Sequence, residues 1–148
     1  MACALQGIGI PTNMSTSPPP LQALRIFVVE DHADTLTAVC QRLEKSGYQV
    51  VASAGNMTDA VEELPGTDCQ VLLSDIGLPD GTGWELLEKV TPLLTKPVYA
   101  IAMSGYSEPS DFEKSRIAGF KQHLVKPFRA QDLLTALETV ELDIRNAS

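Results

Sequence analysis

The chain has 148 residues, of which 44% are hydrophobic and 20% charged, so it is long and apolar enough for one domain with a buried core. Eleven Lys and Arg residues against nineteen Asp and Glu leave a net charge of −8, which disfavours direct binding of nucleic acid or of an anionic membrane. No apolar run approaches the roughly 18 residues of a spanning helix, so we expect no membrane span.

Residues 1–24 differ in composition from the rest of the chain. They carry no charged side chain, and residues 15–20 form a run of Ser, Thr and Pro. A secretory signal needs a basic start and an unbroken apolar stretch, and neither is present. We interpret residues 1–24 as a flexible tail and residues 25–148 as the folded domain. The alternative for the tail is a binding segment for a partner that recognises polyproline.

Short apolar strands alternate with helical periodicity through the first half of the domain. Residues 26–29 are continuously apolar and predict a buried parallel strand. A helix follows, with its apolar face over residues 36–43, and then a strand over 48–52. Residues 57–64 predict a second helix that ends at a Pro-Gly pair, and residues 71–73 predict another buried strand.

The second half repeats this alternation after a turn-rich loop. A helix is predicted over residues 84–90, a strand over 98–103 and a helix over 112–118. A fifth strand over residues 123–125 precedes a last helix with apolar positions over 133–144. Each connection is long enough for a right-handed crossover. The pattern therefore predicts an α/β fold, a doubly wound five-stranded parallel sheet with five helices.

Polar residues stand at the ends of four of these strands. Glu30 and Asp31 end the first, Asp75 the third, Ser104 the fourth and Lys126 the fifth. In this fold class, ligands bind at the carboxyl ends of the strands. Converging carboxylates repel each other unless a cation lies among them, and oxygen ligands suit Mg²⁺. With one carboxylate as the nucleophile and a lysine for phosphoryl oxygens, the pattern predicts capture of a phosphoryl group.

Four short motifs resemble the receiver domains of two-component response regulators. They are residues 29–31 (VED), 74–80 (SDIGLPD), 103–106 (MSGY) and 125–128 (VKPF), each at a predicted strand end and in the family's order. Any one motif is weak evidence, but four in order are a strong signal. The resemblance covers residues 25–144 and implies the family's flavodoxin-like architecture.

The resemblance implies a phosphoacceptor and a metal site. Asp75 would take a phosphoryl group from a phosphohistidine on a histidine kinase or a histidine phosphotransfer protein, or from a small phosphodonor. Asp31, Asp75 and the backbone carbonyl of Gly77 would bind Mg²⁺ directly, and Glu30 would act through a metal-bound water. Independently of the resemblance, the position of Asp75 also suits a cap for the following turn, and the positions of Glu30 and Asp31 suit a cap for the first helix.

It also implies phosphoryl-binding and switching residues. Lys126 would pair with the phosphoryl oxygens, aimed by a cis bond to Pro127, and Ser104 would turn inward to hydrogen-bond them. Tyr106 would flank the phosphoryl position. His123 stands where the family commonly carries Tyr or Phe, so the usual aromatic switch is altered, although a histidine can also change rotamer or charge.

The resemblance implies a signalling module that catalyses only its own phosphorylation and slow dephosphorylation, and is otherwise not an enzyme. Four residues follow Ile144, so we expect output through an unknown downstream protein partner, from a stand-alone receiver or one excised from a hybrid histidine kinase. Two alternatives stay open. One is an interaction module without phosphotransfer, and the other is an aspartyl-phosphate hydrolase, which usually has a second Asp where this chain has Gly77.

The cysteines favour a reducing compartment. Cys3, Cys40 and Cys69 form no C-x-x-C pair and no cluster with histidine at metal-ligand spacing. A disulfide framework and a structural zinc site are therefore disfavoured, and we interpret Cys40 and Cys69 as small buried residues. Histidine is likewise not the ligand that Mg²⁺ prefers, so we interpret His32 as an exposed loop residue. Together these features favour a cytoplasmic protein.

Overall fold

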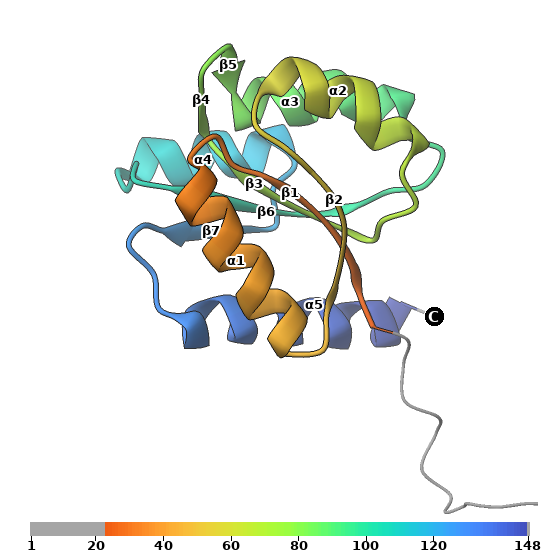
Figure 1. Cartoon of the computed structure of the whole chain (residues 1–148). Helices are drawn as coiled ribbons and strands as arrows, with labels where there is room; N and C mark the ends of the chain where they lie inside the picture. Colours follow the sequence, from red (N-terminus) through yellow and green to blue (C-terminus); the bar gives the residue numbers. More distant parts are fainter. Residues whose placement is uncertain (1–22, 148) are drawn as a thin grey trace, which may run out of the picture.

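The computed structural model describes residues 23–147, so the predicted tail falls almost wholly outside the described residues and its role stays a prediction. A parallel sheet forms the middle of the domain, in the order β2-β1-β3-β6-β7 (Figure 1). Its strands are β1 (Arg25–Val29), β2 (Gln49–Ala54), β3 (Val71–Asp75), β6 (Tyr99–Ser104) and β7 (Gln122–Val125).

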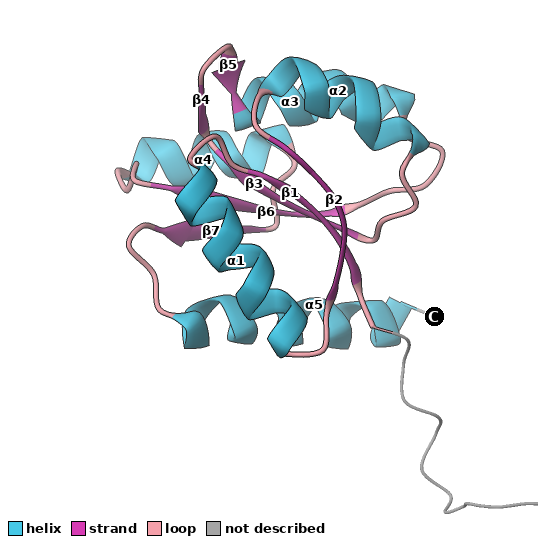
Figure 2. Cartoon of the chain, in the orientation of Figure 1, coloured by secondary structure: helices cyan, strands magenta, loops and turns pink. Residues whose placement is uncertain are grey.

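Five α-helices cover the two faces of this sheet (Figure 2). They are α1 (Ala33–Lys45), α2 (Met57–Glu63), α3 (Gly83–Val90), α4 (Pro109–Ala118) and α5 (Ala130–Ala147). Side chains alternate along each strand, so Ile26 and Val28 pack in a core with α1 and α5, while Phe27 and Val29 pack in a core with α2 and α3. The predicted five-stranded, doubly wound α/β fold is confirmed.

Several boundaries differ from the sequence-based expectations. Helix α4 begins at Pro109 rather than near residue 112, because a proline in the first turn and a capping box between Glu108 and Asp111 start it before its first large apolar residue. The expected loop after β3 contains a two-stranded antiparallel hairpin, β4 (Gly77–Leu78) and β5 (Gly81–Thr82). Two short 3₁₀ turns, η1 (Leu64–Gly66) and η2 (Thr91–Leu93), follow α2 and α3.

The burial of the cysteines agrees with expectation only in part. Cys69 is buried in the core and Cys40 is half-buried, while Cys3 lies outside the described residues.

The folded domain begins before the predicted boundary at residue 25. Leu24, assigned to the tail from composition, is buried against the α1–α5 core, and its carbonyl accepts a hydrogen bond from the Gln49 amide.

Helix α3 packs its backbone directly against the end of β3. The Gly83 amide donates a 2.8 Å hydrogen bond to the Ile76 carbonyl. A β-carbon at Gly83 would lie 2.6 Å from the carbonyl oxygen of Asp75 and 3.2 Å from the α-carbon of Ile76. Backbone atoms cannot rotate away as a flexible side chain can. A glycine is therefore needed for α3 to lie this close to the strand that carries Asp75.

We expect Gly83→Ala to lower the free energy of unfolding by about 1–3 kcal/mol, because the methyl group forces α3 away from β3. Chemical denaturation measures this change. Gly66→Ala is the matched control, since nothing lies within 4 Å of the β-carbon it would add, and it should change stability by no more than about 0.5 kcal/mol. Equal effects of the two substitutions would contradict the close packing at Gly83.

The hairpin between β4 and β5 is fastened to the start of α2 by Asp80. One oxygen of its carboxylate accepts a hydrogen bond from the Met57 amide at 2.7 Å. The other oxygen accepts hydrogen bonds from the Thr58 amide at 2.9 Å and from the Thr58 hydroxyl at 2.6 Å. The Asn56 side chain accepts the next amide, that of Asp59. The first three free amides of α2 thus have partners. Hydrogen bonds from the Thr58 side chain and from the Met57 and Thr58 amides lower the pKa of Asp80 to about 2.

A carboxyl group whose pKa falls on folding stabilises the native state above its unfolded pKa, and this contribution disappears as the pH falls through the folded value. For Asp80 that window runs from about pH 4 down to about pH 2. We therefore expect Asp80→Asn to be less stable than the wild type at pH 7, with the difference shrinking toward pH 2. Unfolding curves recorded across this range give the difference directly, and a gap independent of pH would contradict the role of the charge.

Candidate functional site

Five of the predicted site residues lie at the carboxyl edge of the sheet, whereas His123 lies within β7. Strand β1 lies between β2 and β3, so the strand order reverses direction after β2. The switch point, where the strand order reverses, therefore falls between β1 and β3. Glu30 and Asp31 follow β1, and Asp75 is the last residue of β3. Ser104 ends β6, and Lys126 directly follows β7. Five residues from four strands thus meet where this fold class binds its ligands.

Lys126 holds two buried carboxylates at once. Its Nζ lies 2.7 Å from Glu30 Oε1 and 3.1 Å from Asp75 Oδ2. Glu30 is 1% exposed and Asp75 6% exposed, so neither carboxylate is well hydrated. An unpaired buried charge is costly, and the shared ammonium offsets that cost for both acids.

The pKa values of the three groups move in different directions. Burial raises the pKa of Asp75, and the nearby Glu30 charge adds to the effect of burial, so the pKa stays raised despite Lys126. Burial also acts to raise the pKa of Glu30, but hydrogen bonds from Lys126 and the His32 amide outweigh it, and the net pKa is lowered. Burial acts to lower the pKa of Lys126, whereas its bonds to Glu30 and Asp75 raise it overall. Of Glu30 and Asp75, Asp75 is thus the carboxylate whose negative charge is less compensated.

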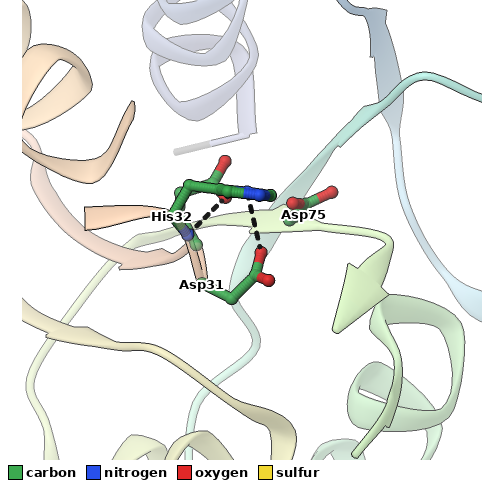
Figure 3. Close-up of side chains that lie close together, drawn as sticks. Asp31, His32 and Asp75 are labelled. Atoms are coloured by element: carbon green, nitrogen blue, oxygen red, sulfur yellow. Dashed lines mark hydrogen bonds and ion pairs between the residues drawn. The ribbon is translucent and has the colours of Figure 1, made fainter. Parts of the chain in front are cut away.

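The arrangement of acids suits a divalent cation. Carboxylate oxygens of Glu30, Asp31 and Asp75, together with a ring nitrogen of His32, lie within 4.8 Å of one another. Figure 3 shows the side chains of Asp31, His32 and Asp75 lying close together. Three carboxylates against one lysine leave an excess of negative charge, and oxygen donors of this kind fit Mg²⁺ better than softer metals.

His32 is exposed, as expected, but it contacts the acidic pair. Its side chain is 74% exposed, and Nδ1 lies 3.3 Å from both Glu30 Oε2 and Asp31 Oδ1. His32 is also the residue that precedes α1, and its side chain makes no capping hydrogen bond. The alternative role of Asp31 as the cap of this helix is therefore not found. The Asp31 side chain is 26% exposed, which leaves the acidic cluster open to solvent.

The remaining predicted residues surround this cluster. The Gly77 amide donates to Asp75 Oδ1 at 3.3 Å, so Asp75 also caps the turn that follows it. The Tyr106 amide donates a 2.8 Å hydrogen bond to Ser104 Oγ, so in this structure the Ser104 hydroxyl is bonded to the loop that follows it. The Tyr106 hydroxyl lies 3.8 Å from the position that a β-carbon on Gly77 would take, so the end of this side chain lies beside Gly77. The Lys126–Pro127 peptide bond is cis.

We expect Asp75→Asn to raise the free energy of unfolding by about 0.5–2 kcal/mol at pH 7 in metal-free buffer. The raised pKa of Asp75 means that its ionised form costs stability above that pKa, and the substitution removes the charge while Lys126 keeps Glu30 as a partner. Thermal unfolding with and without Mg²⁺ measures the effect, and Mg²⁺ should stabilise the wild type more than the variant. Glu138→Gln, at an exposed position in the middle of α5, is the control for loss of one negative charge. A variant less stable than the wild type in metal-free buffer would contradict this balance of charges.

Comparison with known proteins settles the family. A model of the response regulator receiver domain matches residues 26–138. The chain belongs to this family. It is therefore a receiver domain of two-component signalling, and the resemblance based on four motifs is confirmed.

Transcriptional regulatory proteins are among the relatives of this chain. Transcriptional regulatory protein KdpE of Mycobacterium tuberculosis is 32% identical over 115 residues, covering 76% of this chain and 48% of that protein. Transcriptional regulatory protein PdtaR of the same species is 27% identical, covering 77% of this chain and 55% of that protein. The chain thus spans about half the length of these curated relatives.

Solved receiver domains share the fold. A CheY-like receiver domain protein from Methanospirillum hungatei superposes with a TM-score of 0.77 at 28% identity, over 85% of this chain and 99% of that one. The chemotaxis protein CheY4 of Vibrio cholerae has a TM-score of 0.72 at 22% identity, over 80% of this chain and 98% of that one, which is a likeness of fold alone. Within residues 23–147, no helix is long and apolar enough to cross a membrane.

Proposed function

We propose that this receiver takes a phosphoryl group onto Asp75 from a phosphohistidine, in a step that requires Mg²⁺. The donor would be a histidine kinase or a histidine phosphotransfer protein, and the output would pass to a downstream protein partner. The observation that carries the proposal is the contact of Asp75 with Lys126 at 3.1 Å, beside the carboxylates of Glu30 and Asp31. A nucleophile, a phosphoryl-binding cation and oxygen ligands for a metal thus occupy one edge of the sheet.

In the proposed step, a carboxylate oxygen of Asp75 attacks phosphorus as the bond from phosphorus to the donor's imidazole nitrogen breaks, and the histidine leaves with that electron pair. Mg²⁺, when bound, neutralises charge on the phosphoryl oxygens. We assign it to Asp31, Asp75 and the Gly77 carbonyl, with Glu30 acting through a water. The raised pKa of Asp75 reflects a carboxylate whose charge is poorly compensated, and a cation at this point would relieve that repulsion.

Lys126 and Ser104 would bind the transferred group. The ammonium of Lys126 already contacts Asp75, so a phosphoryl oxygen on that carboxylate would lie within its reach. The Ser104 hydroxyl would turn from the Tyr106 amide to donate a hydrogen bond to the same group. Both contacts strengthen as charge builds on the phosphoryl oxygens, which is the condition for catalysis by positioning and charge.

The phosphorylated form would be a signal rather than a step in rapid turnover. Gly77, two residues after the nucleophile, has no side chain to act as acid or base toward an attacking water. We therefore propose that the chain is not an enzyme beyond its own phosphorylation and slow dephosphorylation. Its acidity disfavours direct nucleic-acid contact, and the free thiols of Cys40 and Cys69 suit the cytoplasm.

The test is the mass of the intact protein after incubation with acetyl phosphate, with and without Mg²⁺. We expect one phosphoryl adduct on the wild type with Mg²⁺ and at least a tenfold smaller fraction without it. Asp75→Asn should form no adduct, because a neutral amide replaces the nucleophilic carboxylate. Asp68→Asn is the matched control, since Asp68 is exposed at the opposite end of the sheet and pairs with Arg25.

Three results would count against the proposal: no adduct on a folded wild type, equal labelling of Asp75→Asn, or steady hydrolysis of small phosphate esters. The first would favour a receiver-like interaction module, the second would place the acceptor elsewhere, and the third would favour a hydrolase.

A further inference from the structure

The loop between β1 and α1 carries three metal-binding side chains in succession, Glu30, Asp31 and His32. The Nδ1 atom of His32 lies 3.3 Å from Glu30 Oε2 and 3.3 Å from Asp31 Oδ1. A dashed line in Figure 3 marks the contact between the His32 ring and Asp31. One imidazole nitrogen and two carboxylate oxygens thus form a compact group. Its nitrogen distinguishes this group from a magnesium site, whose ligands are oxygens.

The spacing of these atoms matches the ligands of a tetrahedral zinc ion. Zinc binds imidazole nitrogen and carboxylate oxygen at about 2.1 Å, so two ligand atoms of a tetrahedral site lie about 3.4 Å apart. Both distances measured from His32 Nδ1 are close to this value. An ion between the three atoms would take the place of a proton on Nδ1, which the metal displaces when it binds. The metal-free loop is therefore close to the geometry that such an ion needs.

The other contacts of these side chains leave the three ligand atoms on one side. Lys126 bonds to Oε1 of Glu30, whereas Oε2 accepts the His32 amide at 3.1 Å and so stays beside the imidazole. The His32 ring is 74% exposed and makes no capping hydrogen bond to α1, so an ion on Nδ1 would break no bond that holds this helix. The Asp31 side chain is also partly exposed, which gives an ion access from solvent.

We propose that Glu30, Asp31 and His32 form a site for a divalent transition-metal ion such as Zn²⁺, with His32 as its nitrogen ligand. Imidazole suits Zn²⁺, Ni²⁺ and Cu²⁺, whereas Mg²⁺ is bound through oxygen. Water from the solvent takes the fourth position, because the site has three protein ligands and opens outward at Asp31 and His32. His32 therefore gives the site an affinity for Zn²⁺ that the carboxylates alone do not supply.

Asp31 links this site to the proposed phosphoryl transfer, and only this part of the inference rests on the proposed function. Asp31 is one of the ligands that we assign to Mg²⁺, and a carboxylate oxygen of Asp75 lies within 4.8 Å of the group. Two divalent cations this close together repel each other strongly. Zn²⁺ and Mg²⁺ therefore bind in competition. An ion held on the His32 side takes Asp31 from Mg²⁺, and phosphorylation of Asp75 slows.

The first experiment measures binding to the full chain without a phosphoryl donor. Zn²⁺ is titrated in competition with a chromogenic chelator, and Mg²⁺ binding is followed by amide chemical shifts. We expect His32→Gln to weaken Zn²⁺ binding by about tenfold or more, because it removes the nitrogen ligand, and Mg²⁺ binding by less than about twofold. His123→Gln is the matched control, since the chain has two histidines, and it should change neither affinity by more than about twofold.

All three proteins retain the cysteines, so Zn²⁺ held by thiols would be common to them. Equal Zn²⁺ affinity of wild type and His32→Gln would overturn the site. An equal loss of Zn²⁺ and Mg²⁺ affinity in His32→Gln would overturn the role of His32 as the ligand that favours zinc.

The second experiment follows labelling by acetyl phosphate and Mg²⁺ through intact mass, with and without enough Zn²⁺ to fill the site. We expect Zn²⁺ to reduce the initial labelling of wild type and of His123→Gln by more than half, while His32→Gln keeps most of its labelling. Equal inhibition of His32→Gln, or no inhibition of a zinc-loaded wild type, would overturn the competition. Absence of adduct on the wild type without Zn²⁺ would overturn the proposed function instead, and the first experiment would still decide whether the metal site exists.

Discussion

Lys126 lies between two carboxylates that would otherwise repel each other in a poorly hydrated place. Glu30 comes from the end of β1 and Asp75 from the end of β3, whereas the lysine arrives from β7 at the edge of the sheet. Lys126 and Glu30 are 96 residues apart in sequence, and the order of the sheet places β3 and β6 between their strands, so the site exists only when β1, β3, β6 and β7 have assembled. The chemistry and the completeness of the fold thus depend on the same contacts.

This dependence explains the unequal environments of the two acids. Glu30 receives both the lysine and an amide, and its pKa falls below the ordinary value in spite of burial. Asp75 shares the lysine but is also buried near Glu30, and its pKa rises. A site that left both acids fully compensated would have little affinity for a further cation. Because of this imbalance, positive charge added beside Asp75 relieves more repulsion than the same charge added beside Glu30.

The sequence predicted the features that have a local signal. Residues 71–73 of the buried strand β3 are continuously apolar, and parallel strands expose their carboxyl ends together, so the polar residues that end these strands are expected at one edge of the sheet. The β4–β5 hairpin was missed because two-residue strands have no periodicity. Ser115 resembles any helical serine in sequence, and its partners Trp84 and His123 lie 31 and 8 residues away, so only the folded chain reveals their hydrogen bonds.

The hydrogen bonds between Asp80 and the first residues of α2 affect which loops of the domain can move. The loop after β3, which carries Gly77, is fastened by three short hydrogen bonds to a neighbouring helix. The loop after β6, which carries Tyr106, is exposed and is joined to its surroundings by single bonds to Ser104 and His123. The two loops that flank the site are therefore attached unequally, and a displacement of the loop after β6 breaks fewer of these hydrogen bonds than a displacement of the loop after β3.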